Sequence, residues 1–304
     1  MSGTSLIAID WGTTSARAYR LDARGGVVDE RTAPLGISQV PSGRYEEALS
    51  ALLGEWSSER APRLACGMIG SRQGWIEAPY VACPASIDAL VDGIAAVRTS
   101  KLSIVPGLNT RDRHGTPDVM RGEETQLVGA VDVDESMVLA VLPGTHSKWA
   151  RMERGRIVDF STYMTGELFG VLLAHSILGR MSERSLDVRT EADFLRGVDR
   201  GLKKDGVTHA IFGARTLVLA GEMAAPDVDD WLSGVLIGAE ICAALAWTRD
   251  VGIDVTRVRI IGNDTLAARY ATALGHAGVS SEQGDRQAAA RGLWRIATRA
   301  GLLH

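Results

Sequence analysis

The chain has 304 residues, of which 45% are hydrophobic, enough to bury the cores of two domains of ordinary size. Its 33 basic and 37 acidic residues are interspersed and give a formal charge of −4, so no basic surface for nucleic acid or an anionic membrane is predicted. Cys66, Cys83 and Cys242 form no CxxC pair, which argues against a disulfide framework or a zinc cluster. They are predicted to be reduced core residues.

The first third of the chain predicts an antiparallel meander followed by a helix. A strand is predicted over Leu6–Asp10, followed by the small polar turn Gly12 to Thr14. Further strands are predicted over Ala16–Leu21 and Val27–Thr32, with glycines between them, and a helix over Tyr45–Trp56. The first apolar run is too short for a signal peptide or a membrane span, so a cytosolic location is expected.

The same order of elements returns halfway along the chain. Strands are predicted over Met137–Leu142, Ser147–Met152 and Arg156–Tyr163, with the turn Pro143 to His146 after the first and a helix over Glu167–Leu178 after the third. Internal repetition of this kind predicts two homologous domains. We expect a first domain at 1–132 and a second at 133–304.

The last third predicts further elements of the second domain. These are a strand over Leu217–Ala220, a helix over Trp231–Trp247, a strand over Arg257–Ile261 and a helix from Asp264. A final helix, Arg286–Arg299, is expected to pack on the first domain.

The apolar stretch Trp231–Trp247 is predicted to be a buried helix. Glu240 interrupts it, and it is shorter than the thickness of a bilayer. Gly234 and Gly238 would allow another helix to approach closely, which we favour over a role in membrane dimerisation.

The two hairpin turns carry residues that suit phosphate binding. Turns rich in glycine and threonine present backbone N–H groups and hydroxyls without bulky side chains. Asp10 precedes the first turn and could ligate a magnesium ion. A single turn of this kind is as well explained by an ordinary hairpin, but its recurrence in the repeat favours a phosphate site. The residues concerned are Gly12, Thr13 and Thr14, and Gly144, Thr145, His146, Ser147 and Lys148.

Longer strings resemble known families. IAIDWGTTSARAYRL resembles the first phosphate loop of the actin, hexokinase and heat-shock ATPase superfamily, and LPGTHSKWA resembles the second. The segment Ile260 to Tyr270, with the single glycine Gly262, lies in the place of the adenosine-binding segment. A finer similarity is to the 2-dehydro-3-deoxygalactonokinase family. Its strings are GMIGSRQGW at 67–75, VPGL at 105–108, VMRGEETQLVGA at 119–130, LPGTHSKW at 142–149, TGEL at 165–168 and LSGVLIGAEI at 232–241.

This resemblance implies a fold and a reaction. The implied fold is α/β, a duplicated actin-like (ribonuclease H-like) ATPase fold with two domains flanking a nucleotide cleft. The implied reaction transfers the γ-phosphoryl group of ATP, with Mg²⁺, to the 6-hydroxyl of 2-dehydro-3-deoxygalactonate in galactonate catabolism.

A carboxylate beside the acceptor hydroxyl could take its proton during phosphoryl transfer. We expect Glu123 to be this base, with Glu124 as the alternative, since broader sugar kinases have Gly–Asp where this chain has Gly122, Glu123 and Glu124. Acidic residues are also favoured at a helix start for electrostatic reasons alone. Neighbouring residues on a helix point about 100° apart. One glutamate is therefore expected to be catalytic and the other structural.

The acceptor's carboxylate requires a matching donor. A planar guanidinium suits a carboxylate, so Arg72 and Arg121 are the leading candidates. Gly70, Ser71 and Trp75 are expected to shape the acceptor pocket, although Trp75 could equally belong to the core.

Other candidates follow from position in these motifs. Arg17 could bind phosphate or serve as a cation on the strand surface. His146 is expected to be a hydrogen-bonded residue of the second phosphate loop rather than a catalytic one. Thr165 and Glu167, in TGEL, are expected on the substrate side by resemblance.

Two other classes of function stay open at this point. One is a kinase for another sugar or sugar acid, which substrate profiling would distinguish. The other is a non-catalytic, nucleotide- or sugar-binding protein, either a regulator or an actin-like structural protein. No basic helix-turn-helix extension supports a regulator. We expect no nucleic-acid or membrane partner, and the sequence is compatible with a homo-oligomer.

Overall fold

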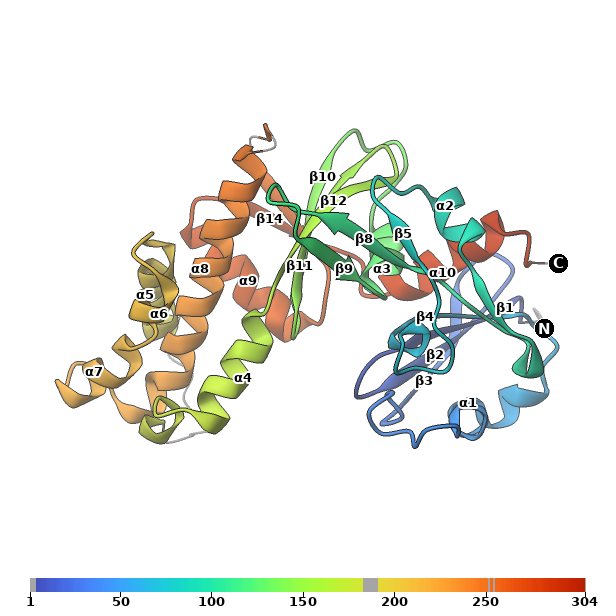
Figure 1. The fold of residues 1–304 in the computed structure, drawn as a ribbon, viewed down its shortest axis with the longest axis horizontal. Coiled ribbons are helices and arrows are strands. Elements are labelled where there is room, and N and C mark those ends of the chain that lie inside the picture. The colour runs from blue at the N-terminus through green and yellow to red at the C-terminus, as the bar shows by residue number, and fades with distance from the viewer. Residues whose placement is uncertain (1–3, 183–190, 251, 254, 304) are drawn as a thin grey trace. The chain divides into compact units, whose positions relative to one another are not determined.

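The computed structural model describes residues 4–182, 191–250, 252, 253 and 255–303. These residues form two compact units (Figure 1). Unit 1 comprises the described residues of Met1–Val138, Ala150–Phe160 and Gly284–His304, and unit 2 those of Leu139–Trp149 and Ser161–Gln283. The end of the chain thus belongs to unit 1, whereas the expected second domain ran on to residue 304.

Unit 1 contains a six-stranded sheet with the strand order β3-β2-β1-β4-β7-β6. Strand β2 pairs antiparallel with both β1 and β3, which confirms the predicted meander, while β4 joins β1 in parallel. The strands are β1 (Leu6–Trp11), β2 (Ala16–Leu21), β3 (Val27–Ala33), β4 (Arg63–Gly67), β6 (Ala95–Val97) and β7 (Leu102–Ile104).

A small sheet and several helices complete unit 1. The small sheet has the order β5-β8-β9. Its strands are β5 (Tyr80–Ala82), β8 (Gly107–Arg111) and β9 (Pro117–Met120). The α-helices are α1 (Tyr45–Leu53), α2 (Ile87–Asp92), α3 (Glu123–Ala130) and α10 (Ala288–Arg299), and the 3₁₀ helices are η1 (Gly54–Ser58), η2 (Met68–Gly70) and η3 (Arg98–Ser100). The predicted helix Tyr45–Trp56 therefore corresponds to α1 and the start of η1.

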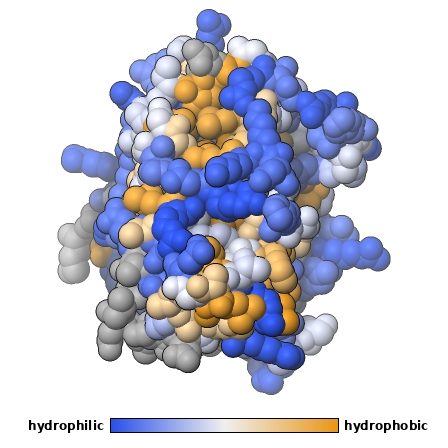
Figure 2. Space-filling model, turned by 90° about the vertical axis from the view of Figure 1, so that its left-hand side faces the viewer, coloured by the Kyte–Doolittle hydropathy of each residue, from blue (hydrophilic) through white to orange (hydrophobic). Residues whose placement is uncertain are grey.

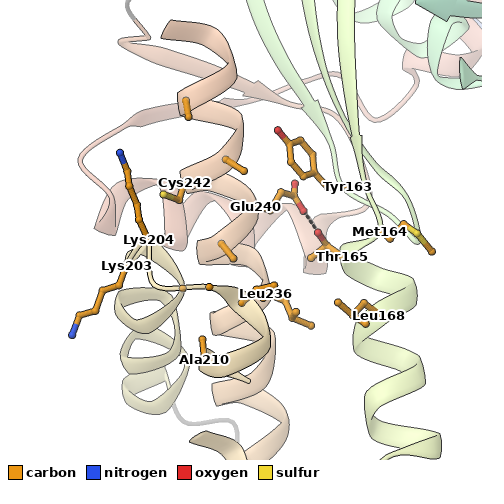
Figure 3. A pocket seen from close by; sticks show the side chains of 16 residues that line it. Tyr163, Met164, Thr165, Leu168, Lys203, Lys204, Ala210, Leu236, Glu240 and Cys242 are labelled. Atoms are coloured by element: carbon orange, nitrogen blue, oxygen red, sulfur yellow. Dashed lines mark hydrogen bonds between the residues drawn. The ribbon is translucent and has the colours of Figure 1, made fainter. Parts of the chain in front are cut away.

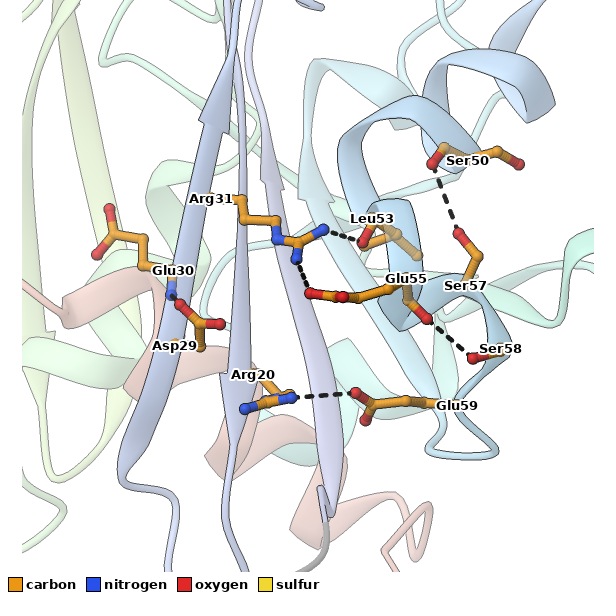
Figure 4. A network of polar contacts seen from close by, with 10 residues as sticks. All are labelled: Arg20, Asp29, Glu30, Arg31, Ser50, Leu53, Glu55, Ser57, Ser58 and Glu59. Carbon is orange, nitrogen blue, oxygen red and sulfur yellow. Dashed lines mark hydrogen bonds and ion pairs between the residues drawn. The ribbon is translucent and has the colours of Figure 1, made fainter.

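Polar contacts tie the meander to the end of α1. The Arg31 guanidinium lies 4.2 Å from the centre of the Trp56 ring and donates to the Leu53 carbonyl and the Glu55 carboxylate. Arg20 donates to Glu59 over 3.3 Å. Figure 4 shows both arginines reaching from the sheet to this segment. The buried indole is thus covered by cations whose N–H groups are hydrogen-bonded.

Helix α10 packs on unit 1 as expected, and the contact with α3 depends on glycine. A side chain at Gly129 of α3 would clash with the Ala288 carbonyl oxygen, and one at Gly292 of α10 would clash with that of Thr125. The backbones therefore approach more closely than any larger residue would allow. This contact fixes α3, which begins at Glu123.

The second sheet repeats the order of the first. Its order is β12-β11-β10-β13-β14. In each sheet the first strand of the meander lies between the second strand of the meander and a strand from later in the chain, which is β4 in the first sheet and β13 in the second. Strand β13 pairs in parallel with β10, as β4 does with β1. The predicted duplication is therefore confirmed. The strands are β10 (Val138–Leu142), β11 (Ser147–Glu153), β12 (Arg156–Tyr163), β13 (Arg257–Ile260) and β14 (Ser280–Gln283).

The helices of unit 2 include one segment that was predicted incorrectly. The predicted strand Leu217–Ala220 is wrong, because its residues form the end of α7, where Ala214 is buried in the same cluster as Trp231. A short apolar run has no periodicity that separates a strand from a helix. The helices are α4 (Thr165–His175), α5 (Glu191–Leu202), α6 (Val207–Ala210), α7 (Gly213–Leu219), α8 (Val228–Asp250) and α9 (Asp264–His276), with η4 (Gly179–Met181) and η5 (Ala225–Asp227).

Helix α8 is a buried helix, as predicted. Side chains at Gly234 or Gly238 would clash with the backbone of α5 at Phe194 or Val198, so the two helices pack closely. The segment Ala225–Asp250 is long and apolar enough to cross a membrane, but 61% of its apolar window is buried in the protein, as in a core helix.

Some apolar side chains of unit 2 reach the surface. Phe212 and Leu219 are 50% and 65% exposed. Figure 2, seen from the side of α5 to α7, shows apolar areas separated by bands of hydrophilic residues. This face is therefore mixed in polarity.

Candidate active site

Asp10 lies near the end of β1, between two partner strands. Its backbone pairs with Arg17 on β2 and with Cys66 on β4. The Cys66 thiol donates to the Asp10 carboxylate over 3.9 Å. Burial raises the pKa of the Asp10 carboxyl, and the charge of Arg17 partly opposes this shift.

The first turn is supported by a segment that the sequence analysis did not single out. Ile37 and Ser38 donate backbone N–H groups to the carbonyls of Gly12 and Thr13. A side chain at Gly36 would clash with the backbone of Thr13 and Thr14. The threonine side chains of the turn are exposed. The segment Gly36 to Ser38 thus holds the backbone of the turn, while the threonine hydroxyls stay accessible to solvent.

Arg17 faces its neighbours on the meander. Its guanidinium lies 3.3 Å from Glu30 and 3.4 Å from the Tyr19 hydroxyl. Its side chain is 48% exposed. The structure therefore places Arg17 on the strand surface, close enough to Asp10 to affect its pKa.

The two glutamates at the start of α3 have different surroundings. Glu124 is fully buried, and its carboxylate accepts from the Gly122 N–H at 2.6 Å and from the Thr125 hydroxyl at 3.0 Å. Glu123 is half-buried and accepts from the Arg121 backbone N–H at 3.0 Å. Burial and the neighbouring Glu123 charge raise the pKa of Glu124 to about 8. Glu124 is therefore mostly protonated at neutral pH.

A glycine contact brings α3 to the end of β4. Gly122 has a φ of 110°, and a side chain there would lie 3.1 Å from the Cα atom of Gly67. Gly67 has a φ of 91°, and a side chain there would lie 2.7 Å from the Trp11 carbonyl oxygen. Both backbone conformations favour glycine. The start of α3 thus lies against the ends of β4 and β1.

The acidic residues from β1 and α3 gather around Cys66. Burial raises the pKa of this thiol well above its usual value, and the charges of Asp10, Glu124 and Glu123 raise it further. The structure therefore brings the three predicted catalytic carboxyls into one region of unit 1. Within the described ranges, no group of three or more His, Cys, Asp or Glu side chains is arranged to hold a metal ion on its own.

The predicted acceptor residues divide into buried and exposed ones. Ser71 and Arg121 are buried, with 6% and 7% of their surface exposed. A side chain at Gly70 would lie 3.0 Å from Nη1 of Arg121. Arg72 is exposed, and Trp75 stacks on Tyr45 at the edge of the core. The structure thus brings Gly70 and Arg121 together and places Trp75 against the core.

The second turn is covered by the start of α4. The Glu167 N–H donates to the Thr145 carbonyl over 2.9 Å, and the Glu167 carboxylate pairs with Nε2 of His146. A side chain at Gly166 would clash with the Gly144 carbonyl oxygen. Gly262 lies beside the same turn, since a side chain there would be 3.7 Å from the Pro143 carbonyl oxygen.

A buried polar network lies behind the second turn, centred on Glu240. Its carboxylate accepts from Nε1 of Trp149 at 2.8 Å, from the Tyr270 hydroxyl at 2.7 Å and from the Thr165 hydroxyl. The Ser147 and Tyr270 hydroxyls are 2.8 Å apart. Burial raises the pKa of Glu240. Glu240 stands out in the sequence only as an interruption of an apolar helix, and this single carboxylate was the available signal of the network.

Lys148, predicted for the second phosphate loop, is also buried. Its ammonium group donates to the Thr162 hydroxyl over 2.8 Å. Ser147, Lys148 and Thr165 therefore have their polar groups engaged within unit 2, whereas Thr145 and His146 are exposed at the turn.

Unit 2 also contains a cavity of about 560 Å³. Its walls include Thr165 and Leu168 on one side and Leu236 and Glu240 on another, with Lys204 at the far side (Figure 3). Among the predicted site residues it includes Thr165 alone. The cavity therefore touches the Glu240 network rather than the turn itself.

The chain is similar to known proteins over most of its length. The family model described as 2-keto-3-deoxy-galactonokinase matches residues 10–296. A Rhizobium meliloti (strain 1021) protein named "Probable 2-dehydro-3-deoxygalactonokinase" is 37% identical over 95% of this chain and 97% of its own. The Escherichia coli (strain K12) 2-dehydro-3-deoxygalactonokinase is 35% identical over 87% of each chain.

Solved structures extend the comparison to the fold. A Sinorhizobium meliloti protein assigned as a 2-dehydro-3-deoxygalactonokinase has a TM-score of 0.88 and 36% identity, covering 97% of this chain and 98% of its own. Component A of the (R)-2-hydroxyglutaryl-CoA dehydratase of Acidaminococcus fermentans covers 98% of this chain and 100% of its own, with a TM-score of 0.55 at 14% identity, and shows the fold alone. The fold is the expected duplicated actin-like fold. The chain belongs to the 2-keto-3-deoxy-galactonokinase family.

Proposed function

We propose that this chain transfers the γ-phosphoryl group of ATP to the 6-hydroxyl of 2-dehydro-3-deoxy-D-galactonate, giving 2-dehydro-3-deoxy-6-phosphogalactonate and ADP in galactonate catabolism. The observation that carries the proposal is the gathering of Asp10, Glu123 and Glu124 around Cys66, next to a turn suited to phosphate. The names and coverage of the relatives support the choice of acceptor.

Phosphoryl transfer depends mainly on positioning and on neutralising the charge of the transferred group. Each of the two turns offers exposed hydroxyls and backbone N–H groups to phosphate oxygens. The supports described above, Ile37 and Ser38 for the first turn and α4 for the second, hold these groups in place. Such preorganised donors need little rearrangement during the reaction.

Glu123 is the proposed general base. A base must reach the acceptor hydroxyl, and Glu123 is the less buried of the two glutamates. Glu124 is closed off by its own hydrogen bonds to Gly122 and Thr125 and keeps its proton at neutral pH. We therefore assign Glu124 a structural role at the start of α3.

Mg²⁺ fits the residues near the first turn. This ion usually takes one or two protein carboxylates and completes its ligands with water and substrate phosphates. Asp10 offers one carboxylate beside the turn, and ionisation of this buried group would be favoured by a cation. Asp10 would hold the ion directly or through water, and the bound ion would neutralise phosphate charge.

Both proposed substrates are small and soluble, so the proposal requires neither a nucleic acid nor a membrane as partner. It places the reaction in the cytoplasm, where ATP is available.

The test is ADP release with Mg-ATP and 2-dehydro-3-deoxygalactonate, compared with the gluconate epimer, simple sugars and no acceptor. We expect turnover that depends on the galactonate compound. Turnover with a different acceptor alone would replace the substrate, and ATP binding without turnover on any acceptor would overturn the enzymatic proposal.

A further inference from the structure

Arg121 is a buried cation with unused hydrogen-bond donors. Only 7% of its surface is exposed, and within the described chain its Nε and Nη1 atoms have no acceptor. A buried charged group without a partner is unfavourable, and such groups are rare in folded proteins. The arrangement is explained if an anion completes it.

A second unpaired group lies in a neighbouring segment. The Ser71 hydroxyl is buried and, among the described residues, has no partner. It follows Gly70, whose side-chain position lies 3.0 Å from Nη1 of Arg121. Five buried side-chain atoms without partners occur in the described residues, and three of them belong to Arg121 and Ser71. The unused donors are therefore concentrated in one place.

The contacts that hold the Arg121 side chain supply no negative charge. Nη2 donates to the Ala78 carbonyl over 2.8 Å, and the guanidinium lies 4.3 Å from the centre of the Tyr80 ring. These contacts fix the plane of the guanidinium and leave the Nε and Nη1 N–H groups for another acceptor. The backbone N–H of Arg121 meanwhile binds Glu123, the proposed base.

We infer that Arg121 and Ser71 bind the carboxylate of the acceptor, so that this site selects sugar acids over neutral sugars. The inference rests on the proposed function and names the group of the substrate that is recognised. A carboxylate accepts charge-assisted hydrogen bonds from a guanidinium and has capacity left for a hydroxyl. Exposed Arg72, the other candidate, needs no such anion.

These donors are shielded from solvent, so the carboxylate can reach them only if neighbouring residues move. The segment from Ser71 to Trp75 is held by the backbone bonds Gly74 N–H to Ser71 and Trp75 N–H to Ile69. Ser71 belongs to this segment, so a local movement of the segment would expose its hydroxyl.

The experiment compares 2-dehydro-3-deoxygalactonate with its carboxamide, which has nearly the same shape but is uncharged and carries an NH2 donor in place of one acceptor oxygen. For Arg121→Met we expect kcat/KM for the acid to fall at least about 30-fold, with a much smaller change for the amide. Ser71→Ala should lower kcat/KM for the acid about 5- to 10-fold. Arg24→Met, which alters an exposed arginine of unit 1, should leave the acid-to-amide ratio unchanged. An unchanged ratio in folded Arg121→Met would overturn the inference.

Two further measurements keep the test decisive. If Arg121→Met fails to fold, Arg121→Lys and Ser71→Ala replace it. Both variants must then lower the ratio of kcat/KM for the acid to kcat/KM for the amide. Calorimetric binding of the acid without ATP separates this inference from the proposed function. If the wild type binds the acid, Arg121→Lys weakens this binding, and no turnover is seen, only the proposed reaction would be overturned. Absence of binding in the wild type would sink the inference as well.

Discussion

Each unit buries a glutamate, Glu124 in unit 1 and Glu240 in unit 2, and the surroundings of the two differ. Glu240 accepts from three side-chain donors and thereby connects β11, α4 and α9 to α8. Glu124 accepts from Gly122 and Thr125 at the start of its own helix. It lies near other carboxyls and near Arg121, whose Nε and Nη1 atoms have no acceptor among the described residues. A satisfied network stabilises structure, whereas groups held in unfavourable surroundings are typical of sites that react or bind.

The sharpest test of this contrast is Glu123→Gln, which removes the proposed base. We expect turnover to fall about 10²- to 10⁴-fold, while ATP binding is retained because the two turns are unchanged. Steady-state ADP release and calorimetry with ATP would measure these effects. Glu55→Gln, which alters an exposed glutamate of the same unit, is the matched control. Full turnover in Glu123→Gln together with loss in Glu124→Gln would make Glu124 the base.

The next largest effect is expected on stability, from Glu240→Ala. The change leaves three donors, on Trp149, Thr165 and Tyr270, without their acceptor. Because each buried unpaired donor costs about 1–3 kcal/mol, we expect the free energy of unfolding to fall by at least about 3 kcal/mol. Denaturant unfolding would measure it, with exposed Glu222→Ala as the control. A loss within about 0.5 kcal/mol of the control would contradict the supporting role of Glu240.

Glu124 should make stability depend on pH. Its pKa is raised from 4.5 to about 8 on folding, so between these values the folded state binds more protons than the unfolded state. Stability must then decrease as pH rises through this window, by up to about 1.4 kcal/mol per pH unit. Glu124→Gln removes this pH-dependent contribution, so the stability of the variant relative to wild type should increase from pH 5.5 to pH 7.5. If stability plotted against pH ran parallel for the wild type and Glu124→Gln, the result would show that Glu124 is not held protonated in the folded state.

The smallest expected effect is that of Thr165→Val. It removes one of the three hydrogen bonds to Glu240 at the start of α4 while keeping the side-chain shape. We expect a loss of about 0.5–1.5 kcal/mol in the free energy of unfolding. If KM for the acceptor rises strongly while the free energy of unfolding changes little, the result would instead support the predicted substrate role of Thr165.

The sequence predicted the repeated meanders well, because alternating apolar residues and glycine turns are local signals. Strands β2 and β12 match the predicted bounds, and β1 and β3 differ from them by one residue. The short run Leu217–Ala220 carried no such signal, and the incorrect strand there turned out to be the end of α7.

The site was predictable to a lesser extent. The turns, Asp10 and the glutamates stood out by residue type and resemblance. The support from Gly36 to Ser38, the position of Cys66 among the carboxyls and the Glu240 network depend on contacts between distant segments. A single sequence does not display such contacts, since they arise only when the elements pack.

The glycine contact between α3 and α10 has a consequence for protein synthesis. Unit 1 holds the proposed base and acceptor residues in its first 130 residues, yet it lacks α10 until residues 288–299 have left the ribosome. Domains near the N-terminus usually fold first during translation. Here the nascent chain carries α3 with an uncovered glycine face until residues 288–299 have been made. Completion of the acceptor side is thereby tied to the synthesis of α10.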